Sequence, residues 1–327
     1  MSSILVLVHP QPDGSLSRHS LEVLALAKSL GGGDVVVGAV GGAPAIPFEG
    51  RVLVVEGEAF TQPRYSTDAA AAQAICEAVK PDVVLAPSTS RWTRCLAGVA
   101  QRVGGRIDTH VTALDESLQA MRWYYRQRIE AVLTRTQRPW FLIIESGSSK
   151  SVAPVAGTPA AVVKIAVSVS PRTEVSGMVS PQGGGQTIKP EAELLFVAGA
   201  GWTKKQKDGR VRAAEAAGLI LGFIDRAGAS LGSSKSLVDL SGEGVSVLPF
   251  LSHLNQVGQT GSTPRHPKGL ATCCHGEEPH VVGWRFINER RAVNLDPSCG
   301  WARGKADVLY VADAFEVVAK LNELLSR

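Results

Sequence analysis

The sequence has few cysteines, no signal-like leader and no long hydrophobic run. Its 327 residues include five cysteines, at positions 76, 95, 273, 274 and 299, and none of them forms a C-x-x-C pair. An odd, scattered set argues against a disulfide framework or a zinc site and fits a reducing compartment. Residues 4–8 are a short apolar run without a basic region before it or a cleavage site after it. We therefore expect a cytoplasmic protein that does not insert into membranes.

Strong charge of one sign is also missing. The formal net charge is +4, with 44% hydrophobic and 20% charged residues, which is typical of a globular protein with ample material for a core. The arginines are scattered, so nothing indicates a nucleic-acid surface. One run, residues 122–128, alternates arginines with aromatics. We interpret it as a solvated strand or at most a partner surface.

The first half alternates apolar runs with helix-like segments. Strands alternating with helices predict a parallel sheet covered on both faces. The predicted strands are residues 4–8, 35–40, 52–55, 83–86, 140–144 and 160–169, and the predicted helices are residues 16–30, 68–80 and 92–103.

Residues 168–190 are rich in proline, glycine and serine and have little periodicity, which is typical of a linker. The chain is therefore predicted to be an α/β protein of two domains, residues 1–185 and 186–327. Each domain is expected to be a mainly parallel sheet flanked by helices, the second one doubly wound.

The stretch Pro87-Ser88-Thr89-Ser90 ends a predicted strand and precedes a helix. Ligand crevices of doubly wound sheets lie at such places, so a nucleotide site is one interpretation. A helix start capped by Ser90 is the other. We favour the capped helix, because no phosphate-loop pattern accompanies the stretch.

The second domain opens with a strand at residues 193–198, a Gly199-Ala200-Gly201 turn and a predicted helix at residues 206–224. A strand that enters a glycine-rich turn before a helix is the geometry that holds a diphosphate. The full G-x-G-x-x-G is absent, so a nicotinamide fingerprint is not supported.

Further along, residues 256–261 read QVGQTG, a loop in which two glycines allow close approach to a flat or phosphorylated ligand. Four more blocks occur in order: LGSSKSLVD at 231–239, CHG at 274–276 followed by His280, NLDP at 294–297, and ADAFEVV at 312–318. Together these blocks resemble the signature of the electron transfer flavoprotein alpha subunit. The clear resemblance covers roughly residues 190–327, and the first half matches in general pattern.

The resemblance implies a C-terminal domain that binds FAD. It implies that the Thr260 hydroxyl reaches flavin N5, that His280 lies at the pyrimidine edge, and that Lys235 replaces an arginine over the ring. Asn294 and Asp296 are expected at the ribityl or diphosphate region, and Asp313 with Ala314 at the adenine end; Asp313 should also cap a helix at residues 314–325. The cofactor-binding residues expected are Gly199, Gly201, Ser234, Lys235, Gln256, Val257, Gly258, Gln259, Thr260, Gly261, Cys274, His275, Gly276, His280, Asn294, Asp296, Asp313 and Ala314.

One departure from the family concerns the turn near Gly201, where the family has an arginine close to the flavin and diphosphate. This sequence lacks it, and Lys204 or Lys205 is the candidate replacement.

The function implied is electron transfer. An alpha subunit holds FAD, forms a heterodimer with a beta subunit that contributes to the flavin pocket and holds AMP, and passes electrons from a dehydrogenase to a downstream acceptor oxidoreductase. The N-terminal domain is expected to pack against that partner without a cofactor of its own. No acid, base or nucleophile constellation indicates substrate chemistry, and no metal site is expected.

Two alternatives stay open. One is a flavoenzyme that oxidises a small substrate directly, with His280 as the base. The other is a degenerate subunit that has lost FAD and acts as an assembly scaffold.

Overall fold

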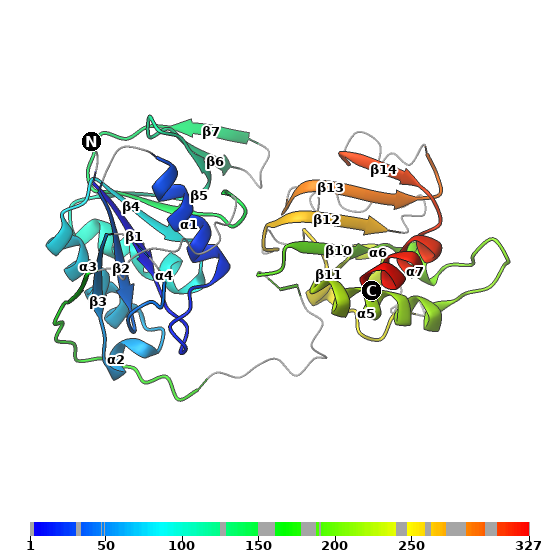
Figure 1. The fold of residues 1–327 in the computed structure, drawn as a ribbon, viewed down its shortest axis with the longest axis horizontal. Helices are drawn as coiled ribbons and strands as arrows, with labels where there is room; N and C mark the ends of the chain where they lie inside the picture. The colour runs from blue at the N-terminus through cyan, green and yellow to red at the C-terminus, as the bar shows by residue number, and fades with distance from the viewer. Residues whose placement is uncertain are drawn as a thin grey trace. The chain divides into compact units, whose positions relative to one another are not determined.

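The computed structural model describes residues 3–30, 34–46, 48, 50–124, 129–149, 161–177, 188–189, 191–239, 247–258, 263–272, 286–297 and 306–326. The chain divides into two compact units, Met1–Val179 and Ser180–Arg327. Each unit is described separately below (Figure 1). In the described residues, no helix is long and apolar enough to cross a membrane.

The N-terminal unit is built on one nine-stranded sheet, counting the described residues, in the order β7-β6-β5-β8-β4-β1-β2-β3-β9. Strands β5, β8, β4, β1, β2, β3 and β9, which are neighbours in this order, run parallel to one another. β6 and β7 extend the sheet beyond β5 as antiparallel strands. The strands are β1 (Ile4–Val8), β2 (Val35–Val40), β3 (Arg51–Val55), β4 (Val83–Pro87), β5 (Arg106–Leu114), β6 (Ala120–Tyr124), β7 (Ile129–Leu133), β8 (Trp140–Ile144) and β9 (Ala161–Lys164).

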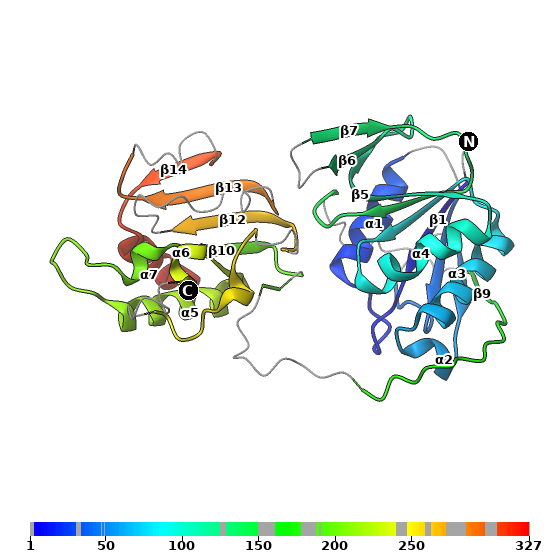
Figure 2. The same cartoon turned by 180° about the vertical axis from the view of Figure 1, so that it is seen from behind.

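Helices cover both faces of this sheet, which is why β1, β4 and β8 are apolar and buried along their whole length. Helix α1 (Arg18–Ser29) packs on one face, and α3 (Tyr65–Val79) and α4 (Ser90–Arg102) pack on the other (Figures 1 and 2). A short helix, α2 (Glu58–Thr61), precedes α3. The prediction of a parallel sheet covered on both faces is confirmed.

A buried carboxylate ties the antiparallel extension to the parallel strands. Asp108 of β5 accepts two hydrogen bonds from the Arg135 guanidinium, each at 3.0 Å, and one from Trp140 Nε1 at 2.9 Å. Arg122 of β6 lies 3.5 Å from the same carboxylate. Burial opposes the charge, but Arg135 and Trp140 lower the pKa of Asp108 below its usual value. Arg122 therefore has a structural partner within the unit.

The C-terminal unit contains a five-stranded, wholly parallel sheet in the order β11-β10-β12-β13-β14, again counting the described residues. Helices α5 and α7 pack together on one face of it. Its elements are β10 (Leu194–Ala198), the 3₁₀ helix η1 (Ala200–Thr203), α5 (Ala213–Ala227), β11 (Ser230–Ser233), α6 (Lys235–Asp239), the 3₁₀ helix η3 (His253–Asn255), β12 (His266–Thr272), β13 (Ile287–Asn294), β14 (Val308–Val311) and α7 (Ala314–Leu325). The predicted α/β class with two sheets flanked by helices is confirmed.

Two predicted elements differ from the structure. The helix expected at residues 206–224 begins only at Ala213, because residues 205–211 turn back on themselves through an antiparallel bridge between Lys205 and Val211. The strand expected at residues 160–169 ends at Lys164, and the apolar residues beyond it pack against the core without strand pairing.

Candidate functional site

The strand order of the C-terminal unit locates a candidate crevice. From β10 the chain moves to the neighbouring edge strand β11, and it then returns to the other side of β10 to form β12. The strand order therefore reverses between β10 and β12. In open α/β sheets, ligands bind outside the carboxyl ends of the strands at such a reversal point.

The glycine-rich turn lies at this reversal point. Gly199 follows β10 and donates its N–H to Thr272 O, at the end of β12, at 2.8 Å. The turn continues as η1, where Trp202 Nε1 donates to Thr272 Oγ1 at 2.9 Å. Gly199 and Gly201 are both buried. The ends of the two strands are thus held together by a tightly packed turn.

Ser234 and Lys235 follow the carboxyl end of β11. Ser234 N donates to Ala198 O at 2.8 Å, and Ser234 Oγ accepts from Leu237 N at 3.3 Å, in the first turn of α6. The Lys235 side chain is 51% exposed, with Nζ 3.7 Å from Asp239 Oδ2. Lys235 therefore presents a positive charge at this edge that is only partly offset by its neighbour.

The first half of the QVGQTG segment is fixed against β11. Asn255 is buried, and its Nδ2 donates to Leu231 O at 3.2 Å. Val257 N donates to Ser233 O at 3.0 Å. Gly258 has a φ of +84°, a backbone conformation that favours glycine, and its N–H donates to Thr263 Oγ1 at 2.8 Å. The two ends of the loop at 258–263 are therefore joined to each other and to the sheet.

The ends of β13 and β14 carry the remaining described candidates. Asn294 is 3% exposed, and its Oδ1 accepts from Asp296 N at 3.1 Å. Ala312 N donates to Asn294 O at 3.1 Å, which joins the two strand ends. Asp313 Oδ1 accepts from Phe315 N at 2.8 Å and caps α7 (Ala314–Leu325), so the predicted capped helix is confirmed.

The structure thus brings Gly199, Gly201, Ser234, Lys235, Gln256, Val257, Gly258, Asn294, Asp296, Asp313 and Ala314 to one edge of one sheet. The other candidates, Gln259, Thr260, Gly261, Cys274, His275, Gly276 and His280, lie outside the described residues.

Two buried polar atoms at this edge, Ser233 Oγ and Gln256 Oε1, have no hydrogen-bond partner among the described residues. Ser233 and Gln256 are paired across a parallel bridge, so their side chains leave the backbone on the same side. A buried unsatisfied polar group costs about 1–3 kcal/mol, and a polar ligand can remove that cost. The residues present therefore suit a ligand that carries hydrogen-bonding groups of its own, as an isoalloxazine with its diphosphate chain does.

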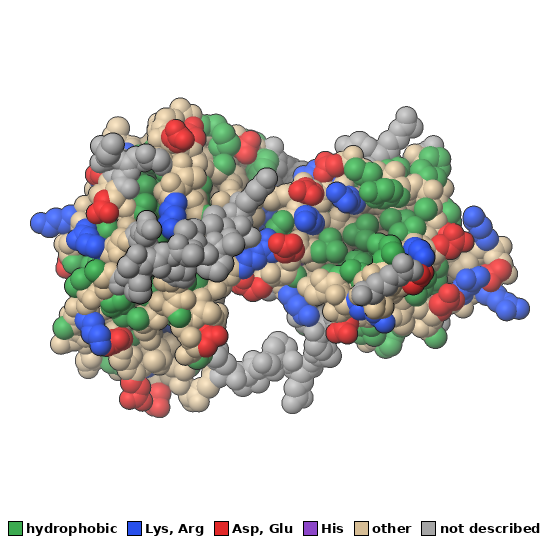
Figure 3. Space-filling model, viewed as in Figure 1, with side chains coloured by type: hydrophobic (Ala, Val, Ile, Leu, Met, Phe, Trp, Pro, Cys, Tyr) green, Lys and Arg blue, Asp and Glu red, His purple; other side chains and the backbone are tan. Residues whose placement is uncertain are grey.

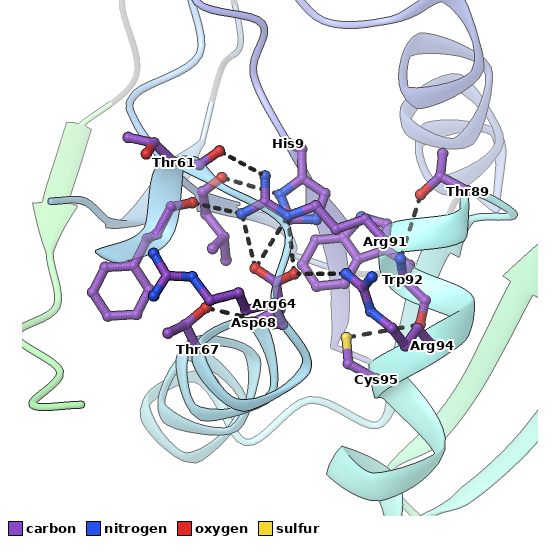
Figure 4. Close-up of polar contacts among 12 residues, drawn as sticks. His9, Thr61, Arg64, Thr67, Asp68, Thr89, Arg91, Trp92, Arg94 and Cys95 are labelled. Atoms are coloured by element: carbon purple, nitrogen blue, oxygen red, sulfur yellow. Dashed lines mark hydrogen bonds and ion pairs between the residues drawn. The ribbon is translucent and has the colours of Figure 1, made fainter. Parts of the chain in front are cut away.

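The N-terminal unit has a second cluster that the sequence analysis missed (Figure 4). Asp68 of α3 is fully buried, and its carboxylate accepts from Arg91 Nε and Nη2 of α4 at 2.8–3.1 Å. Arg94 Nη2 lies 3.6 Å from the same carboxylate. Arg91 also donates to the carbonyl oxygens of Phe60 and Thr61. Burial raises the pKa of Asp68, and both guanidiniums oppose that rise.

The start of α4 explains the Pro87–Ser90 stretch. Thr89, and not Ser90 as predicted, is the N-cap, because its Oγ1 accepts from Trp92 N at 3.5 Å. Helix assignments differ by a residue at their ends, and both serine and threonine are preferred N-cap residues. The interpretation as a capped helix start stands, with its cap one residue earlier.

His9 lies beside this cluster, directly after β1. Its ring stacks on Trp92 with centroids 4.0 Å apart, and Nδ1 is 3.1 Å from Val40 O. Burial, together with Arg91, lowers the pKa of His9 to about 3. The imidazole is therefore neutral at pH 7, with Nδ1–H donating to Val40. In the part of the chain that the structure describes, the buried atoms His9 Nε2 and Trp92 Nε1 have no hydrogen-bond partner.

His9 makes the N-terminal unit sensitive to acid. Its pKa is lower in the folded than in the unfolded state, so the unfolded chain binds more protons and stability falls as pH drops below about 6.5. We expect the free energy of unfolding of the wild type, relative to that of His9→Phe, to fall by ~1.4 kcal/mol per pH unit between pH 6 and pH 4. Urea denaturation of both proteins across this range measures it, and parallel pH profiles would contradict it.

A third polar group lies at the ends of β4 and β8. His110 Nδ1 is 2.9 Å from Glu145 Oε1, and Ser88 Oγ donates to the same oxygen at 3.2 Å. Hydrogen bonding to Glu145 raises the pKa of His110. His110 has a φ of +57° where the pairing of β5 with β8 shifts register. Both Ser88 and His110 contact the carboxylate and not each other, so the group does not form a nucleophile–base pair.

The described cysteines, Cys76 and Cys95, are buried, and burial raises the pKa of each thiol to about 12. They are inert thiols in the core at neutral pH. In the described part of the chain no group of three or more His, Cys, Asp and Glu residues could hold a metal ion.

Comparison with known proteins gives one informative match. The family model of the electron transfer flavoprotein domain matches residues 4–170. No curated protein matches the chain. Among solved structures, the crystal structure of SsfS6, a glycosyltransferase of Streptomyces sp. SF2575, matches at 12% identity and a TM-score of 0.25, over 100% of this chain and 92% of that one. At that score the similarity carries no conclusion.

Proposed function

This chain belongs to the electron transfer flavoprotein family, and from that premise we propose that it is the alpha-type subunit of such a flavoprotein. In this role it holds FAD at the carboxyl edge of the C-terminal sheet. It forms a heterodimer with a beta-type subunit that holds AMP, and it works in the cytoplasm between a donor dehydrogenase and a downstream acceptor.

The observation that carries the proposal is the convergence of the motif residues. They come from segments that span more than a hundred positions of the sequence, yet those in the described residues follow the ends of β10, β11, β13 and β14 at one edge. Blocks with no shared role would be scattered over both ends of the sheet. The strand order reverses between β10 and β12, and a ligand crevice is expected at the carboxyl ends of the strands at such a point.

The described residues would hold the cofactor through several kinds of contact. The turn at Gly199 and Gly201 and the capped start of α7 suit the diphosphate chain and the adenosine half. Gln256 and Ser233 offer buried hydrogen-bonding atoms, and Lys235 offers a positive charge that stabilises negative charge on the ring. Bound FAD supplies the electron-accepting and electron-donating chemistry.

Co-expression with a beta-type partner tests this function. We expect a yellow heterodimer with stoichiometric FAD that a dehydrogenase reduces and that small substrates alone do not. Bleaching by a small substrate without a donor protein would favour the direct oxidase. A colourless heterodimer would favour the scaffold and overturn the carrier assignment.

Thr260 gives a sharper test of the flavin site. If its hydroxyl bonds to the flavin, Thr260→Ala should weaken FAD binding by roughly 3- to 10-fold, the value of one hydrogen bond of about 0.5–1.5 kcal/mol. Thr260→Ser keeps the hydroxyl and should bind FAD as the wild type does. Titration of the deflavinated heterodimer with FAD measures both. Equal affinities for all three proteins would remove Thr260 from the site.

A further inference from the structure

Residues 204–212 form a projecting hairpin between η1 and α5, which we call the cationic arm. It is visible as the long loop of the C-terminal unit in Figure 1. Its sequence carries one acid, Asp208, and five cations: Lys204, Lys205, Lys207, Arg210 and Arg212. This concentration of one sign of charge contrasts with the near balance of the whole chain.

The arm is an ordered structure. Gln206 N donates to Arg210 O at 2.9 Å, and Gly209 N donates to Gln206 O at 2.8 Å, with Gly209 at a φ of +75°. The Gln206 amide ties the base of the arm to the turn, donating to Gly201 O at 3.0 Å and Lys204 O at 2.8 Å. The backbone that carries the cations is therefore ordered, which keeps them grouped on one short hairpin.

The acidic side chain of the arm already pairs with one of the arm's own cations. Asp208 Oδ2 accepts from Arg212 Nη2 at 2.7 Å, and this hydrogen bond lowers the pKa of Asp208. Lys205, Lys207 and Arg210 are exposed, and in the described part of the chain no acidic side chain pairs with them. Figure 3 shows Lys and Arg side chains, with Asp and Glu side chains between them, at this end of the unit.

The arm begins at the carboxyl edge of the sheet, since η1 follows β10 directly. We propose that the cationic arm is a docking surface for an acidic surface of a redox partner protein, which it holds beside the flavin. This inference rests on the proposed function, because it needs the flavin at that edge. Clustered charges of one sign steer an oppositely charged partner and raise its association rate by 10- to 1,000-fold at low salt.

The test uses the FAD-loaded heterodimer, reduced and then mixed with acceptors of opposite charge. Ferricyanide is an anionic electron acceptor and serves as the probe for an acidic partner, and hexaammineruthenium(III) is a cationic electron acceptor and serves for comparison. At an ionic strength of about 10 mM, where the Debye length is about 30 Å, the charge reversal Lys205→Glu/Lys207→Glu/Arg210→Glu should slow oxidation by ferricyanide about 10-fold or more and accelerate oxidation by the ruthenium complex. Poly-L-glutamate should inhibit the ferricyanide reaction of the wild type and not that of the variant.

A matched control makes the same change of charge near the amino ends of the strands of the same sheet: Lys189→Glu/Arg226→Glu/Lys268→Glu. It should alter both rates much less. Equal rates in the arm variant and this control, with flavin fully bound, overturn the docking surface while the proposed function stands. Stronger inhibition by duplex DNA than by poly-L-glutamate at equal charge concentration overturns the assignment to an acidic protein. A heterodimer without flavin overturns both.

Discussion

Replacement of Gly232 by alanine is expected to loosen the QVGQTG loop and weaken FAD binding by roughly 5- to 150-fold. An added Cβ on Gly232 would overlap Val257 Cγ2 and press on Leu195 Cδ1 at 3.2 Å. Valine is stiff about χ1, so the backbone of the loop must move instead. Overpacking of this kind costs about 1–3 kcal/mol. In the proposed FAD site the loop must be in place for binding, so the free energy of FAD binding falls by the same amount.

The clash has a direct rescue. In Gly232→Ala/Val257→Ala the space for the new methyl group is restored, and FAD affinity should recover most of the loss. Gly218→Ala is the control, because Gly218 lies in α5 with no atom within 4 Å of an added Cβ. FAD titration of the deflavinated heterodimers compares the three variants. Unchanged affinity in Gly232→Ala would show that the loop is not part of the site.

Replacement of Asp68 by asparagine is expected to lower the free energy of unfolding of the N-terminal unit by about 3 kcal/mol. The change leaves the mostly buried Arg91, 15% exposed, without its countercharge. Breaking a buried ion pair from one side typically costs 3–5 kcal/mol. We expect the lower end of about 3 kcal/mol because Arg91 keeps the carbonyl groups of Phe60 and Thr61 as acceptors.

Replacing both Asp68 and Arg91 distinguishes the contribution of their ion pair to stability from the contribution of the packing around them. Asp68→Leu/Arg91→Met replaces the charges by apolar side chains and should be clearly more stable than Asp68→Asn. Hydrogen exchange of the β1 and β4 amides reports the stability of this unit by itself. If the double variant proves the least stable, Arg91 and Asp68 act through their other contacts and not as an ion pair.

The parallel part of the first sheet was predictable, because fully buried strands read as continuous apolar runs. Residues 4–8, 35–40 and 140–144 have the predicted bounds. β5 and β7 were not predicted, and β6 was anticipated only by the interpretation of residues 122–128 as a solvated strand or partner surface, because these strands have few buried residues and include charges. Asp108 of β5 bonds to Arg135 and Trp140, which are 27 and 32 residues away in the sequence.

The start of α5 shows a signal that was present and overlooked. Asp208-Gly209 is a strong short-range hairpin signal, because glycine accepts the positive φ that tight turns require. The pattern of apolar residues alone extended the predicted helix back through this turn. A rule that lets turn residues override periodicity would have placed the helix start near Ala213.

The two candidate sites differed in how much the sequence revealed. Most of the proposed C-terminal site consists of residues next to each other in short motifs, so the family resemblance could name them as candidates. The N-terminal cluster joins His9, Asp68 and Arg91 from three separate elements, and none of them lies in a motif. Such contacts arise from the packing of helices on the sheet, which single-sequence patterns do not encode.

The attachment of the QVGQTG segment to β11 also protects the molecule from self-association. β11 is an edge strand, and the outward carbonyl groups of such strands are templates for pairing with another chain. Here Ser233 O accepts from Val257 N and Leu231 O accepts from Asn255 Nδ2. While these hydrogen bonds are in place, the segment covers the outer edge of β11 and a strand from another chain cannot pair there. Variants that release the segment from β11 should therefore aggregate more readily.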